Sequence, residues 1–305
     1  MKQGDYVVRR SYGGDVLFRI DAFRQQTAIL KGTDYRLLAD APLNDLTVIY
    51  DPDSTDATLE VRIKEHESMR RFREQSKSAS VSVSASLDAD MERMAPLNVP
   101  AGMTYFDLPG KILHLDGDGH YLRKSMQLYG QMRIPAHGIH SHESLMADIL
   151  RRMLPQLQPD IVVITGHDGV YKQQPSANLS LLSSYKNSQN FVNAVRAARE
   201  YDRSRDSLIV VAGACQSHFE ALLQAGANFA SSPGRILIHA LDPVYVAIQA
   251  SKTSIRETVN LADVIRGTIS GTEGMGGVDT LGKYRMGMPK PKVVEKPAQI
   301  AVNEG

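Results

Sequence analysis

Two apolar runs decide the fold: DIVVITGHDG at residues 160–169 and LIVVAGACQ at residues 208–216. Each run is short, rich in Val and Ile, and shows no alternation of polar and apolar residues before its end. This pattern is typical of strands that are buried on both faces of a parallel sheet. The runs KILHL (111–115) and RILIHA (235–240) have the same character, so we expect all of these runs to be strands of one sheet.

Amphipathic stretches separate the apolar runs. Residues 187–201, NSQNFVNAVRAAREY, have apolar side chains on one side and supply the crossover helix that a βαβ unit requires. Residues 142–154, HESLMADILRRML, are also amphipathic, and we expect Pro155 to end their helix. The alternation of strands and helices predicts an α/β domain over residues 103–288, a parallel-sheet sandwich covered by helices.

The N-terminal region has a different pattern. Residues 1–52 contain short runs in which apolar and polar residues alternate, separated by Gly, Asp and Asn. This alternation predicts a small antiparallel, SH3-like β-barrel. Residues 53–102 combine a charged segment, predicted to be a helix, with a serine-rich flexible linker. The tail at residues 289–305 is predicted to be disordered.

The composition argues against several classes of partner. The 305 residues include 35 Lys and Arg against 34 Asp and Glu, so we expect neither nucleic acid nor an anionic membrane as the main partner. No run reaches the roughly 20 apolar residues of a membrane span, and the N-terminus lacks the apolar core of a signal peptide. We therefore expect the protein to work in the compartment where it is made. Cys215 is the single cysteine, so it cannot form an internal disulfide or a thiolate zinc cluster.

Two chemically active side chains follow the two deciding strands. His167 comes just after the first run, and Cys215 comes just after the second. The carboxyl ends of parallel strands collect at one edge of a sheet, where ligands bind. We therefore expect His167 and Cys215 to meet at that edge although they are far apart in the sequence.

This pair of residue types suits nucleophilic catalysis. A thiol has a pKa of about 8.5 and attacks as the thiolate, so it needs a base or a positive local potential. The segment QSHFEALLQAG (216–226) predicts a helix whose positive N-terminus would lie at or just after Cys215. His167 can take the thiol proton and give it to a leaving amine. The amides of Gly169 and Cys215 are candidates to stabilise a developing oxyanion.

Other interpretations of these residues remain open. A lone buried cysteine is often a small core residue, and a lone histidine is often a satisfied polar group. The same dyad also serves amidohydrolases and acyltransferases. His218 is a rival base, disfavoured because a substrate must fit between base and nucleophile. The histidines in HGIHSHE (His137, His140 and His142) have no clearly spaced fourth ligand, so we expect neither a metal nor a cofactor.

Acidic residues at the same edge could bind a cation or a basic side chain. Asp116 and Asp118 follow the first strand of the sheet, where a turn-forming Asp-Gly pair is the simpler explanation. Asp168 and Asp242 are further candidates, because a carboxylate binds a guanidinium through two hydrogen bonds. The segment GTEGMGG (271–277) has no preceding strand for a dinucleotide site, so we expect a loop over the active edge.

Several blocks of sequence resemble known peptidases. An apolar run ending in His-x-Gly, followed by one ending in Ala-Cys, resembles the caspase, gingipain and legumain group of cysteine peptidases. A narrower likeness, to the YabG family of sporulation-specific peptidases of spore-forming bacteria, covers most of residues 4–288. It is carried by GDYVVRRSYGGDVLFRI (4–20), LKGTDYRLLADAPLNDL (30–46), VVITGHDG (162–169), SYKNSQNFVNAVRAAR (184–199), VAGACQSHFEALLQAGANFASSP (211–233) and IHALDPVY (238–245).

The resemblance implies a caspase-like sheet and a catalytic pair at Cys215 and His167. It also implies limited proteolysis of spore-coat proteins, after Arg or Lys, in the cytoplasm of the mother cell and in the spore coat. A non-catalytic spore-coat binding or scaffold protein is the alternative. With a basic preference, we expect self-cleavage in the linker region, near Arg70, Arg71 and Arg73, because accessible segments are where nicking concentrates.

Overall fold

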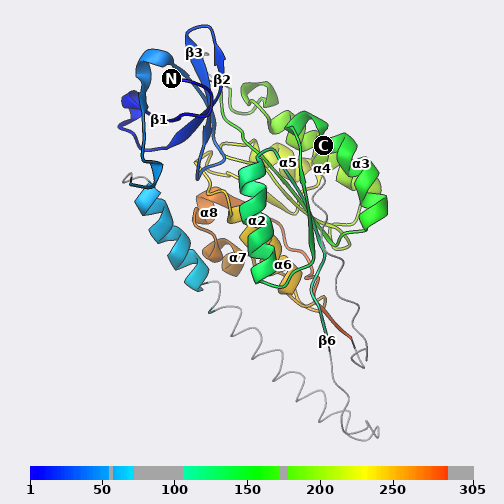
Figure 1. Ribbon diagram of the computed structural model, residues 1–305. Coiled ribbons are helices and arrows are strands. Elements are labelled where there is room, and N and C mark those ends of the chain that lie inside the picture. Colours follow the sequence, from blue (N-terminus) through cyan, green and yellow to red (C-terminus); the bar gives the residue numbers. More distant parts are fainter. Residues whose placement is uncertain (55–57, 72–73, 75–105, 172–177, 288–305) are drawn as a thin grey trace, which may run out of the picture.

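The computed structural model describes residues 1–54, 58–71, 74, 106–171 and 178–287 (Figure 1). A small antiparallel sheet from the N-terminal region lies at one end of a larger α/β domain (Figure 1). The predicted serine-rich linker and the tail at residues 289–305 lie outside the described residues. No helix in the described part of the chain is both long and apolar enough to span a membrane.

The α/β domain is built on a six-stranded sheet with the order β12-β11-β10-β9-β7-β8. Its parallel strands are β7 (Ile112–Asp116), β8 (Ala136–His140), β9 (Ile161–Thr165), β10 (Ile209–Ala212) and β11 (Phe229–Ser231). The edge strand β12 (Met275–Gly277) is antiparallel to β11. The predicted strands at residues 111–115, 160–165 and 208–214 are β7, β9 and β10, which confirms a central parallel sheet.

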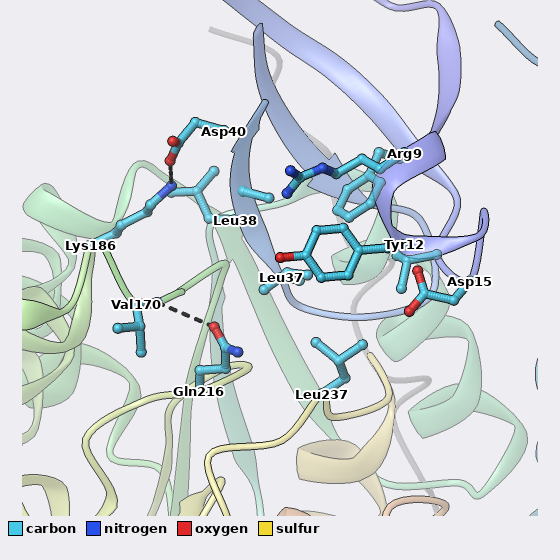
Figure 2. Close-up of a pocket in the computed structure, with 13 residues that line it drawn as sticks. Arg9, Tyr12, Asp15, Leu37, Leu38, Asp40, Val170, Lys186, Gln216 and Leu237 are labelled. Atoms are coloured by element: carbon cyan, nitrogen blue, oxygen red, sulfur yellow. Dashed lines mark hydrogen bonds and ion pairs between the residues drawn. The ribbon is translucent and has the colours of Figure 1, made fainter. Parts of the chain in front are cut away.

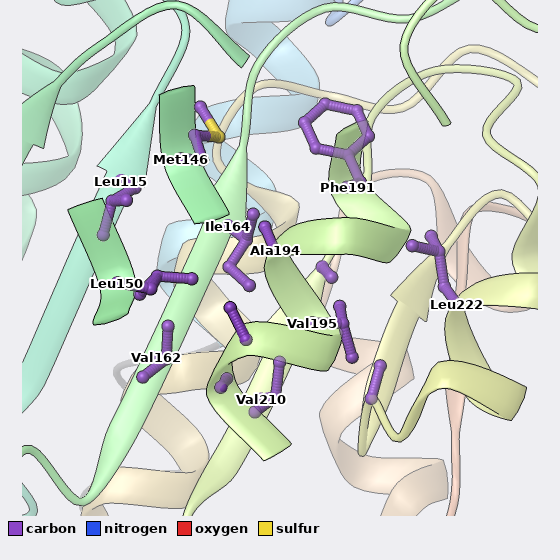
Figure 3. Close-up of a cluster of buried hydrophobic side chains, with 14 of the residues drawn as sticks. Leu115, Met146, Leu150, Val162, Ile164, Phe191, Ala194, Val195, Val210 and Leu222 are labelled. Atoms are coloured by element: carbon purple, nitrogen blue, oxygen red, sulfur yellow. The ribbon is translucent and has the colours of Figure 1, made fainter. Parts of the chain in front are cut away.

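Helices cover both faces of this sheet. One face carries α3 (Met146–Leu157), α4 (Ser188–Tyr201) and α5 (Phe219–Ala225), which pack on alternate strand residues such as Val162 and Val210 (Figure 3). The other face carries α2 (Gly119–Gln131), α6 (Asp242–Lys252) and α7 (Leu261–Gly267), with α8 (Gly271–Gly274) following. Successive strand residues point to opposite faces. Both faces of the strands are therefore apolar, which confirms the predicted sandwich.

The N-terminal sheet has five antiparallel strands in the order β4-β3-β2-β1-β5. They are β1 (Tyr6–Arg9), β2 (Phe18–Arg24), β3 (Thr27–Gly32), β4 (Leu38–Pro42) and β5 (Leu46–Val48). Val7, Phe18, Ile20 and Leu30 form its own core. The antiparallel prediction is confirmed. No strand pairing joins β4 to β5 in the described residues, so closure as an SH3-like barrel stays a prediction.

Residues 58–71 form the predicted charged helix. The Ser68 hydroxyl donates to the Gly267 carbonyl at 2.6 Å, and the Glu65 carboxylate lies 3.3 Å from His239 Nε2. This helix therefore packs against the α/β domain. The remaining elements are β6 (Phe106–Leu108), paired with β13 (Arg285–Gly287), and the short 3-10 helices η1 (Arg10–Tyr12), η2 (Leu43–Asp45), η3 (Pro52–Ser54), η4 (Glu143–Leu145) and η5 (Leu182–Ser184).

Three details of the prediction are wrong. Residues 235–240 form no strand, because the chain turns at positive φ at Ser232 (66°) and Arg235 (56°), and β11 takes the place beside β10. Pro155 lies inside α3, in its last turn, where few helical hydrogen bonds remain to be lost. The segment at 271–277 forms α8 and β12 instead of a loop. A Cβ at Gly277 would lie 2.4 Å from the carbonyl oxygen of Asn228, the residue before β11, so glycine permits this pairing.

Candidate active site

The ends of β9 and β10 bring His167 and Cys215 to the same edge of the sheet. The two strands are parallel neighbours, with Ile164 paired to Ala212. Beyond that pair, the Gly213 amide still donates to the Ile164 carbonyl at 3.0 Å. Gly213 has a φ of 114°, which L side chains rarely adopt, so glycine allows the chain to turn toward Cys215. Both His167 and Cys215 are fully buried.

The Cys215 thiol lies against the backbone of Ile238. Its Sγ accepts a hydrogen bond from the Ile238 amide at 3.1 Å and donates to the Ile238 carbonyl at 3.4 Å. Burial raises the pKa of Cys215, although the Ile238 amide and the Arg36 guanidinium oppose this shift. The helix N-terminus expected to activate the thiol does not reach it, because α5 begins at Phe219 with His218 as its N-cap.

His167 is buried with its imidazole free of hydrogen bonds. Neither Nδ1 nor Nε2 has a hydrogen-bond partner among the described residues, so none joins this ring to Cys215. The ring stacks on Tyr121, with 5.3 Å between centroids, and Nε2 lies 3.9 Å from the Asp118 carboxylate. Burial lowers the pKa of His167, while the Asp118 charge opposes this shift. A neutral imidazole without a partner is able to accept a proton.

The connection between β3 and β4 enters this edge of the sheet. Its Arg36 is completely buried. The carbonyl oxygen of Arg36 accepts hydrogen bonds from two backbone amides, that of Cys215 at 3.2 Å and that of Asp168 at 3.1 Å. The Gly169 amide, predicted to act with Cys215, instead donates to the Asp168 carboxylate at 2.8 Å. The two amides that converge on one oxygen are therefore those of Cys215 and Asp168.

Asp116 ends β7 and binds the Arg36 guanidinium. Nη1 and Nη2 donate to Oδ1 and Oδ2 at 3.0 and 2.9 Å, and Arg36 Nε donates to the Ala240 carbonyl at 2.9 Å. The Thr165 hydroxyl donates to Asp116 Oδ2 at 3.0 Å. Burial would raise the pKa of Asp116, but Arg36 and the His114 ring hold it well below its usual range. Asp116 thus holds a basic side chain, supplied here by the same chain.

The other two predicted acidic residues bind donors of neighbouring loops. The Asp168 carboxylate accepts from the hydroxyls of Ser188 at 2.6 Å and Ser217 at 3.0 Å. Burial raises the pKa of Asp168 to about 6, against the effect of these hydrogen bonds. The Asp242 carboxylate accepts from the Ile269 amide at 2.7 Å, and burial raises its pKa as well. In this arrangement both carboxylates tie loops together at the edge of the sheet.

The remaining histidines have structural contacts. His218 caps α5 by accepting from the Ala221 amide at 3.4 Å, and its Nε2 lies 3.0 Å from the Ser180 carbonyl. Both of its ring nitrogens are therefore occupied.

The histidines of the HGIHSHE segment lie on β8, at positions 137 and 140, and at the N-cap of η4, at position 142. In the ranges that the structure describes, no group of three or more His, Cys, Asp or Glu side chains has an arrangement able to hold a metal ion.

A cavity of about 230 Å³ lies between the N-terminal sheet and the α/β domain (Figure 2). Its lining includes Leu37, from the β3–β4 connection, and Gln216, the residue that follows Cys215. The Gln216 side chain accepts from the Val170 amide at 3.2 Å, and Lys186 forms an ion pair with Asp40 at the rim (Figure 2). The cavity is thus lined by the residues that follow Arg36, beginning with Leu37.

Comparison with known proteins now identifies the family. A sequence profile described as YabG peptidase U57 matches residues 2–289. This chain belongs to the YabG peptidase family. The sporulation-specific protease YabG of Bacillus subtilis (strain 168) is 40% identical over 291 residues, which cover 94% of this chain and 97% of that relative. No solved structure matches the chain. The family resemblance predicted from the sequence blocks is confirmed, and the chain is a peptidase.

Three contacts of this YabG-family site were not predicted from the sequence. Tyr121, in the first turn of α2, stacks on His167 and donates its hydroxyl to the Tyr35 carbonyl at 3.0 Å. Asp118 is the N-cap of α2, and its carboxylate also lies 3.9 Å from His167 Nε2. Arg36 lies within residues 1–52, which the sequence predicts to form the barrel. Arg36 lies between two strands of the N-terminal sheet, and no local sequence pattern there predicts that its side chain is buried at the edge of the other sheet.

Proposed function

We propose that this peptidase is a cysteine endopeptidase in which Cys215 is the nucleophile and His167 is the general base. The observation that carries the proposal is the convergence of the Cys215 and Asp168 amides on one carbonyl oxygen. Preorganised amide donors of this kind stabilise the oxyanion of acyl transfer. The nucleophile of the proposal is the thiol of Cys215, the only cysteine of the chain. The base is the imidazole of His167, which follows the adjacent strand and has no hydrogen-bond partner among the described residues.

The reaction begins when the Cys215 thiol loses its proton to His167 and the sulfur attacks the scissile carbonyl carbon. The amides of Cys215 and Asp168 hold the oxyanion. His167 then gives the proton to the leaving amine, and water hydrolyses the thioester. Tyr121 keeps the His167 ring in place by stacking, and the Asp118 carboxylate at 3.9 Å stabilises the imidazolium that forms.

We propose that the enzyme cuts after Arg or Lys, with Asp116 as the base of the pocket for that side chain. Asp116 already holds the Arg36 guanidinium through two hydrogen bonds. Arg36 and the His114 ring lower the pKa of Asp116, so its carboxyl is ionised. A buried carboxylate rejects a neutral side chain because its charge would be left unpaired. Asp168 and Asp242 are weaker candidates, because the donors that bind their carboxylates are hydroxyls and amides, whereas Asp116 also binds a guanidinium.

The relative's name suggests the setting. We propose that the chain acts in sporulation, on spore-coat proteins, in the mother-cell cytoplasm and in the spore coat. Self-cleavage in the linker region remains part of the proposal. Arg70 and Arg71 are exposed at the end of the helix at residues 58–71, whereas Arg73 lies outside the described residues.

The test is the hydrolysis of a peptide library with a single basic residue. We expect cleavage after Arg and Lys by the wild-type chain, and a loss of at least about a thousandfold in kcat/KM for Cys215→Ala and for His167→Ala. The matched control is His218→Ala, because His218 follows Cys215 by three residues but is engaged in capping α5. Full activity of Cys215→Ala would end the proposal. Cleavage of simple amides or esters without peptides would indicate an amidohydrolase or acyltransferase instead.

One observation favours the alternative of a non-catalytic scaffold: the thiol is buried and burial raises its pKa. A scaffold would bind spore-coat proteins equally well with and without Cys215, and would release no peptide. Circular dichroism of each variant shows whether the fold is intact, so a loss of cleavage can be assigned to chemistry.

A further inference from the structure

We propose that residues 34–38 occupy the substrate-binding site of their own chain, and that Arg36–Leu37 is a peptide bond that the enzyme cuts in itself. This proposal rests on the proposed cysteine peptidase function. It adds a defined internal substrate, located in the N-terminal sheet and separate from the linker.

The backbone of this segment pairs with residues 238–240 through a short antiparallel bridge. The Arg36 amide donates to the Ile238 carbonyl at 3.3 Å, and the Ala240 amide donates to the Asp34 carbonyl at 2.9 Å. These bonds form an antiparallel bridge between Tyr35 and His239. Extended peptides bind many proteins in this way, with main-chain bonds for affinity and side-chain pockets for specificity.

Two further hydrogen bonds hold the residues that follow Arg36, on the C-terminal side of the bond to be cut. The Leu37 amide donates to the Tyr35 carbonyl at 2.8 Å, so the chain bends with Arg36 at the apex. The Leu38 amide then donates to the Asp168 carbonyl at 2.7 Å. The chain is therefore fixed on both sides of the Arg36–Leu37 bond.

The side chain and the carbonyl group of Arg36 both occupy the places that a substrate requires. The guanidinium is bound through two hydrogen bonds by Asp116. It also lies 5.0 Å from the centre of the Tyr121 ring, the ring that stacks on His167. The carbonyl oxygen accepts from the Cys215 and Asp168 amides. A basic residue that only stabilised the fold would need the ion pair, but not its carbonyl between these two amides.

The cleavage step follows from the proposed mechanism. The Cys215 sulfur forms a bond to the Arg36 carbonyl carbon while its proton passes to His167. The bond from that carbon to the Leu37 nitrogen breaks, and His167 returns the proton to this nitrogen. Water then hydrolyses the thioester, which leaves a carboxylate on Arg36 and a free amine on Leu37.

Room for the new amine exists beside the site. The cavity between the two sheets begins at Leu37, and Gln216 lines its inner wall (Figure 2). After cleavage, the covalent link between β3 and β4 is lost, so the end at Leu37 can move away from the site. Arg36 then has a free carboxyl end in the site, and other substrates can enter once this end dissociates from Asp116.

The experiment follows the purified full-length chain over time by intact mass and N-terminal sequencing. We expect a new terminus at Leu37 in the wild-type chain and none in Cys215→Ala. An intramolecular cut has a rate constant that is independent of protein concentration over a hundredfold range. A rate that rises in proportion to concentration, or cutting of Cys215→Ala at this bond by added wild-type enzyme at the same rate, would overturn the internal-substrate claim.

Variants of two basic residues show whether the cut requires the Arg36 side chain in the Asp116 pocket or only an exposed basic residue. Arg36→Gln should reduce the Leu37 terminus at least a hundredfold, and Arg36→Lys should retain it. Arg24→Gln, at the exposed C-terminal end of β2, should leave it unchanged. If Arg36→Gln does not fold, the comparison of wild type with Cys215→Ala still decides the matter.

Failure of this proposal can be told apart from failure of the proposed function. If the wild-type chain cuts basic peptides in trans but never yields the Leu37 terminus, the internal substrate is refuted while the peptidase stands. If wild type and Cys215→Ala both yield that terminus, another protease cuts the bond and the proposal is wrong. If neither peptides nor the chain are cut, both proposals fall.

Discussion

The backbone amide of Cys215 lies 3.2 Å from the carbonyl oxygen of Arg36, although the two residues belong to different parts of the fold. This contact brings the N-terminal sheet onto the carboxyl edge of the central sheet. In consequence the thiol is covered by the protein's own chain, and it is neutral because burial raises the pKa of Cys215. The predictions below follow from this closed arrangement.

Alkylation should report the cover over the thiol. In the intact chain, we expect iodoacetamide to modify Cys215 slowly at neutral pH, because the thiol is buried and protonated. In folded Arg36→Gln, where the guanidinium no longer holds the segment, we expect the rate to rise at least about tenfold. Mass spectrometry of the single cysteine measures this rate. Equal rates in both proteins would mean that Arg36 does not control access.

Substrate preference should depend on Asp116. Asp116→Asn keeps the shape of the pocket but removes its charge, so we expect kcat/KM for an Arg peptide to fall about a hundredfold or more. The preference over a Gln peptide should fall with it. Asp40→Asn is the control, because Asp40 is exposed at the rim of the cavity. Kinetics with paired Arg and Gln peptides provide the measurement, and an unchanged preference would place the pocket elsewhere.

Stability should respond to pH through Asp168. Burial raises the pKa of this carboxyl to about 6 in the folded chain, above its ordinary value of about 3.9. Below pH 4 both states hold the proton, whereas above pH 6 both have lost it and the folded state carries the penalty. The free energy of unfolding should therefore fall by about 3 kcal/mol, relative to Asp168→Asn, as pH rises from about 4 to about 6. Urea denaturation of both proteins measures this difference. A constant difference, or one of opposite slope, would contradict the assignment.

The ring of Tyr121 should matter more to catalysis than its hydroxyl. Tyr121→Phe keeps the stacking on His167 but loses the hydrogen bond to the Tyr35 carbonyl. We expect kcat on peptides to stay within about threefold, while self-cleavage slows because the segment is held less firmly. Tyr121→Ala should lower kcat about tenfold or more and shift its pH profile, since His167 loses its support. A pH profile that is the same in all three proteins would exclude this role for Tyr121.

The sequence predicted the centre of the fold better than its margins. Continuous apolar runs identified β7, β9 and β10, because strands buried on both faces have few alternatives. The edge strand β8 was missed, since its AHGIH sequence is only partly buried. The run at residues 235–240 was misassigned because apolar character alone cannot distinguish a strand from a buried turn. Its residues instead form the wall on which Arg36 docks.

The same limits apply to the site. The rule that parallel strands share a carboxyl edge predicted that Cys215 and His167 follow neighbouring strands at one edge of the sheet, as the pairing of β9 with β10 shows. The rule gave no information on how the N-terminal sheet packs against that edge. For this reason Arg36, Tyr121 and the Asp168 amide were found only in the structure. The position of a covering segment depends on long-range packing, which leaves no local pattern in the sequence.

The identity of the nucleophile is the central claim, and covalent trapping tests it most directly. The protein is incubated with a peptidyl arginine chloromethyl ketone and then digested for peptide mapping. We predict loss of activity in step with a single modification on Cys215, and protection by an excess of Arg peptide substrate. Inactivation with Cys215 unmodified, or equal labelling of a residue other than Cys215 in the Cys215→Ala variant with activity retained, would contradict the account.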